Sequence, residues 1–199
     1  MNIGVLASHN GTNLQAMIDA CEAKKLNATV CVVISNNSRS GAADRAQRHK
    51  IQFRHLSSAT HPDSDSLDAG ICDALDSAKT DIVFLAGYMK KLGKITLEKY
   101  KGRILNTHPA LLPKFGGKGM YGMNVHEAVI AARERKSGVS IHIVDAEYDT
   151  GPVIAQCLVD VLPDDTAETL RERVMTRERI FVVETLQRIA SGELKLNDL

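Results

Sequence analysis

The sequence predicts an α/β protein built around a mostly parallel, twisted β-sheet flanked by helices. In the first half of the chain, short apolar segments alternate with amphipathic segments of helical spacing. One apolar segment, residues 81–86, is almost continuously hydrophobic, as expected of a strand that helices cover on both faces. The 199 residues are 44% hydrophobic and 25% charged, which is sufficient for a buried core in one large domain.

The first half of the chain, residues 1–100, contains the regular alternation. Strands are expected at residues 3–7, 29–35, 51–55 and 81–86, and helices at residues 14–21, 42–49 and 63–77. Because a helix lies between most successive strands, we expect parallel strands joined by right-handed crossovers. We therefore predict a Rossmann-like half that binds phosphate.

The second half, residues 101–199, has a different pattern. Strands are expected at residues 103–107, 138–144 and 153–161, and helices at residues 125–133 and 164–190. Prolines and glycines shape a loop over residues 109–120. Too few residues separate the last two strands for a crossover helix, so we predict an antiparallel pair. The last helix is expected to begin at a cap formed by Asp165 or Thr166, completing a single domain of residues 1–199.

Composition and cysteine spacing exclude several classes of protein. A formal net charge of +1 gives no strong field for nucleic acid or an anionic membrane, so neither is expected as a partner. The four cysteines are scattered without C-x-x-C spacing, which indicates reduced thiols. No apolar run approaches the ~18 residues of a membrane span, and the first residues lack the basic segment of a signal peptide. We expect a cytoplasmic monomer or homodimer that binds small molecules.

Gly11, Thr12 and Asn13 lie where the first predicted strand meets the first helix. Free N–H groups and partial positive charge at a helix N-terminus favour phosphate. Ligands of α/β proteins also gather at the carboxyl ends of parallel strands. These three residues are therefore candidates for a phosphate site. Thr12 and Gln15 also match a capping box, which would need no ligand, so both interpretations stay open.

Asn106 and His108 end a predicted strand, and strand alternation places them on the same side. An amide can stabilise a carbonyl oxygen, and an imidazole can exchange a proton. Asp149, in the acidic loop between the last two strands, would complete a set suited to acyl transfer if it reaches His108. The alternative is a loop asparagine, a solvent histidine and an ordinary acidic turn. The acidic loop lacks EF-hand spacing, so no metal is expected. His142 is expected to support the site rather than act on the substrate.

Residues 85–92 form a further candidate segment, in which an apolar strand opens into Gly-Tyr-Met. Such a segment can form one side of a binding site for a flat aromatic ligand, while its backbone groups form hydrogen bonds with ring nitrogens. A strand end followed by a basic turn is the alternative.

Together these segments resemble the glycinamide ribonucleotide formyltransferases, a folate-dependent family of purine biosynthesis, over essentially the whole chain. The most specific stretches are SHNGTNLQA from Ser8, LAGYM from Leu85, NTHPALLP from Asn106, GVSIHIV from Gly138 and DTGP from Asp149.

The resemblance implies a formyltransferase fold and an enzyme that transfers the formyl group of 10-formyltetrahydrofolate to the amine of 5′-phosphoribosylglycinamide. Asn106, His108 and Asp149 are the implied catalytic residues, with a protonated His108 stabilising the oxyanion. The residues implied to bind the nucleotide phosphate and ribose are Gly11, Thr12, Asn13 and Glu178. The residues implied to bind the folate are Tyr88, Met89, Lys90, Lys91, Leu92, Val144 and Asp145.

Two departures from the family pattern concern the folate. Many members carry an arginine after a serine near position 64, whereas residues 63–66 of this chain read DSDS. Lys90 stands where members vary between arginine and lysine, and it offers a point charge instead of a planar fork. The alternatives with the same chemistry, methionyl-tRNA formyltransferase and formyltetrahydrofolate hydrolase, carry further domains. A non-catalytic nucleotide-binding module would have no need of the three catalytic residues together.

Overall fold

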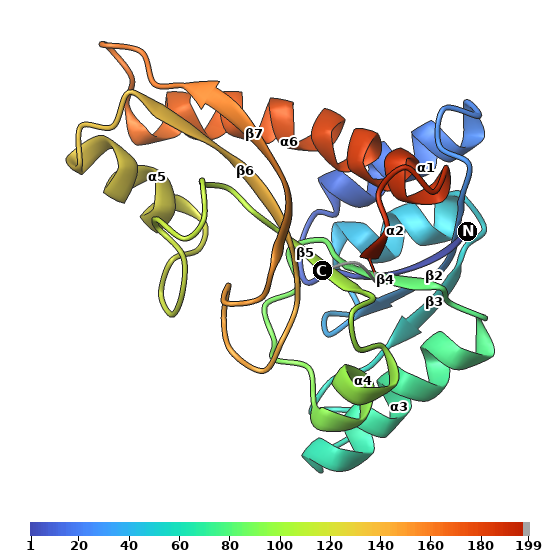
Figure 1. Cartoon of the computed structure of the whole chain (residues 1–199). Coiled ribbons are helices and arrows are strands. Elements are labelled where there is room, and N and C mark those ends of the chain that lie inside the picture. The colour runs from blue at the N-terminus through green and yellow to red at the C-terminus, as the bar shows by residue number, and fades with distance from the viewer. Residues whose placement is uncertain (197–199) are drawn as a thin grey trace.

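A computed structural model describes residues 1–196, in which seven strands form one sheet with helices on both faces (Figure 1). The strands are β1 (Asn2–Leu6), β2 (Thr29–Ser35), β3 (Gln52–His55), β4 (Ile82–Leu85), β5 (Ile104–His108), β6 (Lys136–Ile143) and β7 (Val153–Asp160). The helices are α1 (Thr12–Glu22), α2 (Gly41–Arg48), α3 (Ser64–Ser77), α4 (Lys94–Lys99), α5 (Met123–Ala131) and α6 (Ala167–Ala190).

The strand order is β3-β2-β1-β4-β5-β6-β7. Pairing is parallel from β3 through β5, and β6 pairs antiparallel with both β5 and β7. The predicted α/β class, with a mostly parallel sheet and an antiparallel pair near the C-terminus, is therefore confirmed. The antiparallel part is larger than predicted, because it includes β5.

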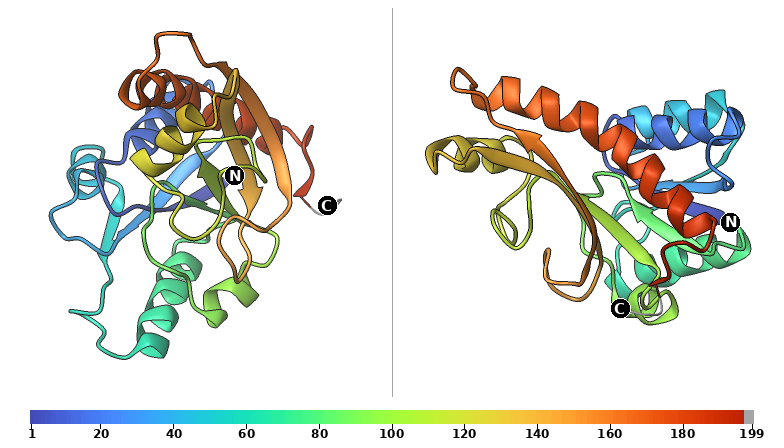
Figure 2. Two further views of the ribbon diagram at one scale, coloured as in Figure 1. Left: turned by 90° about the vertical axis from the view of Figure 1, so that its left-hand side faces the viewer. Right: turned by 45° about the horizontal axis from the view of Figure 1, so that its top comes forward.

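Two hydrophobic cores lie on opposite faces of the sheet. The larger one packs the sheet against α1, α2 and α6 and contains Met17, Phe84 and Leu186. The smaller one packs it against α3 and the end of α4, and contains Leu75 and Tyr100. Two views in Figure 2 show α6 crossing one face, with α3 and α4 on the other. The central strands are buried on both faces, which explains their nearly continuous hydrophobic sequences.

Most predicted elements agree with the structure to within a few residues at their ends. Helix α4 was not predicted, since it has only six residues and no side-chain cap of its own. Helix α6 begins after Thr166, whose side chain accepts a hydrogen bond from the Thr169 amide, as one of the two predicted caps requires. All four cysteines are free thiols. Among residues 1–196, no helix combines the length and hydrophobicity needed to cross a membrane.

Candidate active site

Antiparallel pairing of β5 with β6 brings the predicted catalytic residues together. Asn106 lies opposite His142 in the register of the two strands. Asp149 lies in the loop between β6 and β7 and adopts a left-handed backbone, with φ of 57°. Its carboxylate reaches both histidines: Oδ2 is 3.4 Å from His108 Nδ1, and Oδ1 is 3.4 Å from His142 Nε2. The four side chains thus form one cluster, and both histidines and the carboxylate are largely shielded from solvent.

His142 fixes the orientation of the Asn106 amide. His142 Nδ1 is 3.0 Å from the Ile143 carbonyl oxygen, which can only accept a hydrogen bond, so Nδ1 carries hydrogen. In the neutral ring, Nε2 is then an acceptor, and Asn106 Nδ2 lies 3.1 Å from it. One N–H of the amide is engaged in this way, which leaves the other N–H for an oxygen of a ligand.

The loop after β5 contributes backbone groups that side-chain patterns did not identify. The Phe115 carbonyl accepts a hydrogen bond from His108 Nε2 at 2.7 Å. The Gly117 amide donates to Asp149 Oδ2 at 3.0 Å. The loop of prolines and glycines predicted here therefore supplies polar contacts to two of the three catalytic candidates. Its unusual composition was the only signal in the sequence.

The protonation state of His108 differs from the expected one. Burial lowers the pKa of His108, and the Asp149 carboxylate and the Phe115 carbonyl offset this effect only in part. Burial acts to raise the pKa of Asp149, but the proximity of His142, the hydrogen bond from the Gly117 amide and the proximity of His108 outweigh it and lower that pKa. At neutral pH the free site therefore favours a neutral His108 beside an ionised Asp149. The expectation that Asp149 keeps His108 protonated is wrong for the unliganded protein, because burial dominates.

The capping-box interpretation of the first helix is also wrong. Gly11, with φ of 66°, is the N-cap of α1, and no side chain caps this helix. Thr12 is its first helical residue, and the Gln15 side chain instead bonds Asp19 and Arg45. The N-terminus of α1 thus keeps its N–H groups free of side-chain acceptors, as an anion site requires.

Glu178 joins α6 to the N-terminal end of α1. The Thr107 hydroxyl donates to Glu178 Oε1 at 2.8 Å. Burial raises the pKa of Glu178, and hydrogen bonds from Thr107 and Asn13 partly offset this. Asn13 Oδ1 is buried without a hydrogen-bond partner among the described residues. The predicted nucleotide residues therefore lie together, and Thr107 is an addition that the sequence did not single out.

The two segments predicted to bind folate also approach one another. Tyr88 and Val144 pack against the same core, to which Leu92 belongs. Lys91 Nζ donates to the Ala146 carbonyl at 3.1 Å and lies 4.9 Å from the centre of the Tyr148 ring.

Some side chains in these segments are already engaged by other protein groups, and others are exposed to solvent. Lys91 Nζ also pairs with Glu147, at 3.3 Å, so its ammonium group joins the two segments. Asp145 accepts hydrogen bonds from the Glu147 amide and the Thr150 hydroxyl. Lys90 and Met89 are exposed. Lys91 is exposed as well, but its ammonium group is engaged by the neighbouring loop.

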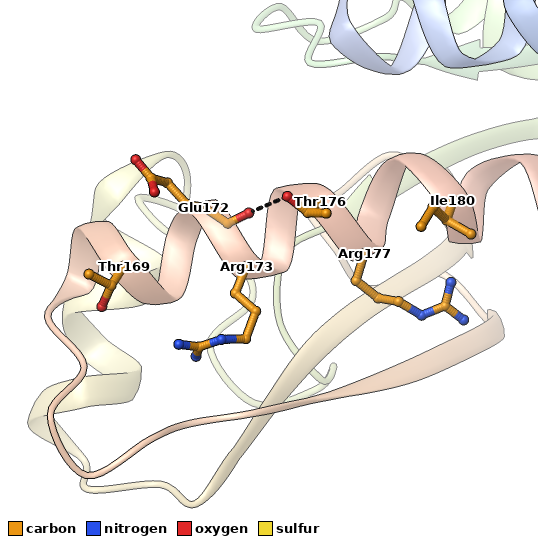
Figure 3. Close-up of a pocket in the computed structure, with 6 residues that line it drawn as sticks. All are labelled: Thr169, Glu172, Arg173, Thr176, Arg177 and Ile180. Atoms are coloured by element: carbon orange, nitrogen blue, oxygen red, sulfur yellow. Dashed lines mark hydrogen bonds between the residues drawn. The ribbon is translucent and has the colours of Figure 1, made fainter.

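A groove of about 570 Å³ runs along α6 (Figure 3). It is lined by Thr169, Glu172, Arg173, Thr176, Arg177 and Ile180. Its two arginines are already paired: Arg173 forms two hydrogen bonds with Asp165, and Arg177 bonds Glu184. None of the predicted site residues lines this groove.

The formyl transferase family model matches residues 1–186. This chain belongs to the formyl transferase family. Among curated relatives, the chloroplastic phosphoribosylglycinamide formyltransferase of Arabidopsis thaliana is 37% identical over 97% of this chain. The phosphoribosylglycinamide formyltransferase of Escherichia coli is 35% identical over 100% of it. The chain spans 66% of the length of the plant relative and 91% of the bacterial one.

A solved structure supports the same family assignment. Glycinamide ribonucleotide transformylase 1 from Symbiobacterium toebii superposes with a TM-score of 0.88 at 35% identity, covering 96% of this chain and 88% of that one. The predicted formyltransferase fold is thereby confirmed.

Proposed function

We propose that this protein transfers the formyl group of 10-formyltetrahydrofolate to the amine of 5′-phosphoribosylglycinamide, giving formylglycinamide ribonucleotide and tetrahydrofolate in de novo purine biosynthesis. The cluster of Asn106, His108 and Asp149 at the end of β5 carries this proposal. The similarity of nearly the whole chain to phosphoribosylglycinamide formyltransferases supports it.

In the proposed reaction the amine nitrogen attacks the formyl carbon, and the carbonyl oxygen becomes an oxyanion. The free N–H of the Asn106 amide is the proposed donor to that oxyanion. Collapse of the tetrahedral intermediate breaks the bond to N10 of the folate. The attacking amine loses one proton and N10 gains one.

His108 is the proposed carrier of that proton. Nε2 already donates to the Phe115 carbonyl, so the neutral ring, which its lowered pKa favours, would accept the proton released by the amine at Nδ1. The imidazolium formed in this way is stabilised by the Asp149 carboxylate 3.4 Å away. Returning the proton to N10 restores the neutral ring. No bond between the substrate and the protein is needed.

The nucleotide phosphate would bind the uncapped N-terminus of α1 at Gly11, Thr12 and Asn13, and its ribose would bind Glu178. The folate would contact Tyr88, Met89, Lys90, Leu92 and Val144, with Lys91 and Asp145 holding the adjoining loop. His142 would position Asn106.

We further propose that residues 1–199 act as a single domain in the cytoplasm, as a monomer or homodimer, without nucleic acid, membrane or metal. Size-exclusion chromatography with light scattering measures the oligomeric state.

A single assay tests the proposed reaction. Purified protein is incubated with 10-formyltetrahydrofolate and 5′-phosphoribosylglycinamide, and the products are identified by mass spectrometry. Formylglycinamide ribonucleotide is the expected product. Formate alone would indicate a hydrolase. Nucleotide-dependent thermal protection without turnover would indicate a binding module.

A further inference from the structure

A buried carboxylate outside the catalytic cluster caps a helix that belongs to a different part of the chain. Asp68, on α3, has only 6% of its surface exposed. Its Oδ2 accepts a hydrogen bond from the Ile95 amide at 2.7 Å. Its Oδ1 accepts from the Thr96 hydroxyl at 2.5 Å and from the Thr96 amide at 3.3 Å. These donors lie in the first turn of α4, whose N-cap residue Gly93 has no side chain with which to cap it.

Gly93 makes room for this arrangement. A Cβ atom at residue 93 would collide with the carboxylate of Asp68. Because the negative charge also faces the positive end of a helix, the contact is favourable on two grounds. The position of the first turn of α4 is therefore set by a side chain of α3.

The segment of residues 87–92, just before this turn, is held in a similar way at its other end. The Ser8 hydroxyl, after β1, accepts a hydrogen bond from the Met89 amide at 2.8 Å and donates to Asn36 Oδ1 at 2.6 Å. Next to the first of these anchors, burial and then the charge of Asp68 raise the pKa of Tyr88 to about 12. Polar side chains from distant parts of the chain thus clamp both ends of this segment.

We propose that Asp68 is a positioning residue for the formyl donor: by capping α4, it holds residues 87–92 in the conformation that receives the folate ring. This inference rests on the proposed function, since residues 87–92 are the proposed folate segment. Asp68 acts through α4 and has no contact with the reacting groups. Its loss should therefore weaken folate binding and leave nucleotide binding unchanged.

The test compares three single variants with the unaltered protein. Asp68→Asn keeps the shape of the side chain but loses the charge and one acceptor, and Gly93→Ala disturbs the same contact from the other side. Each should raise KM for 10-formyltetrahydrofolate about tenfold, the effect expected from losing one helix cap, with KM for the nucleotide unchanged. Asp76→Asn is the matched control, because its exposed ion pair with Lys99, at 3.1 Å, also joins α3 to α4 without capping it. It should change neither KM.

Hydrogen exchange and calorimetry distinguish failure of the positioning role from failure of the proposed function. Hydrogen exchange of the Ile95 and Thr96 amides should accelerate in Asp68→Asn, and calorimetry should show weaker binding of tetrahydrofolate. Faster exchange with unchanged tetrahydrofolate binding would overturn the positioning role alone, as would an equal rise of KM for both substrates or unchanged exchange. Failure of the unaltered protein to bind tetrahydrofolate would overturn the proposed function and this inference together.

Discussion

At the scale of single residues, the site depends most on Asp149. Its left-handed backbone turns the carboxylate toward the sheet, where it meets His108, His142 and the Gly117 amide. A non-glycine residue in this conformation is uncommon and is held in place by its surroundings. The carboxylate is thus placed by contacts from β5, β6 and the loop after β5 together.

Replacing Asp149 should separate chemistry from nucleotide binding. Asp149→Asn keeps the shape of the side chain but removes the charge that stabilises the imidazolium of His108. We expect kcat to fall by about 100-fold or more, with little change in nucleotide affinity. Steady-state kinetics and calorimetry with 5′-phosphoribosylglycinamide measure the two effects, and Glu172→Gln on the exposed face of α6 is the control. Turnover equal to that of the unaltered protein would remove Asp149 from the mechanism.

His142 should have a smaller effect than Asp149, because it acts through Asn106. His142→Ala removes the acceptor that orients the Asn106 amide and one partner of Asp149. We expect kcat to fall about tenfold, less than the loss of a direct oxyanion donor, with both KM values close to those of the unaltered protein. Parallel kinetics of Asn106→Ala and of the double variant provide the comparison. A loss in the double variant equal to the product of the two single losses would assign His142 a role independent of Asn106.

Sequence reasoning identified some of these residues and missed others for physical reasons. Strand alternation placed Asn106 and His108 on one side, but spacing alone could not show that Asp149 reaches them. Phe115 and Gly117 act through backbone atoms, which no pattern of side chains reveals. The pKa of His108 depends on burial, which opposes the effect of its neighbouring carboxylate.

At the scale of elements, the N-terminus of α1 is available to an anion because no side chain caps it. Thr12→Asp would place a carboxylate at its first helical position. This charge should stabilise the isolated helix while repelling a phosphate, so weaker binding could not be attributed to unfolding. We expect KM for the nucleotide to rise more than about tenfold, with KM for the folate unchanged.

Thermal melting and kinetics with both substrates measure these effects. Thr176→Asp is the control, since it adds the same charge on the exposed surface of α6. Unchanged nucleotide affinity in Thr12→Asp would exclude phosphate binding at α1.

The elements that sequence predicted best are those defined by local signals. Helix α6 has both a cap at Thr166 and a long amphipathic pattern. Helix α4 escaped prediction because its cap, Asp68, comes from α3. The pairing of β5 with β6 escaped as well, because the helix between them, α5, is typical of a parallel crossover.

At the scale of the whole molecule, a buried histidine makes stability dependent on pH. His126, on α5, is 2% exposed, and its Nδ1 has no hydrogen-bond partner among the described residues. Burial, with the charges of Arg171 and His108, lowers its pKa from 6.5 to about 4. Between about pH 4 and pH 6.5, His126 is therefore protonated in the unfolded chain and neutral in the folded protein. The contribution of His126 to stability is thus most favourable above about pH 6.5 and falls by about 3 kcal/mol as pH drops toward 4.

His126→Leu should reduce this dependence. The variant removes the titrating ring together with a buried polar atom that lacks a partner, so its stability at pH 7.5 should not be lower than that of the unaltered protein. Urea unfolding at pH 7.5 and pH 4.5 gives the two free energies of unfolding for each protein. An equal loss of stability on acidification in both proteins would show that other groups cause the dependence.

The register between β5 and β6 restricts where this chain can tolerate insertions and deletions. Asn106 faces His142 only because the two strands align as they do, and successive residues of a strand point to opposite sides. One residue inserted between Val139 and His142 would therefore turn His142 away from the catalytic cluster. An insertion in the turn before Lys136, at the far end of β6, would leave this alignment intact. Length variation among members of the family, and in engineered libraries, should therefore occur between these strands and not within them.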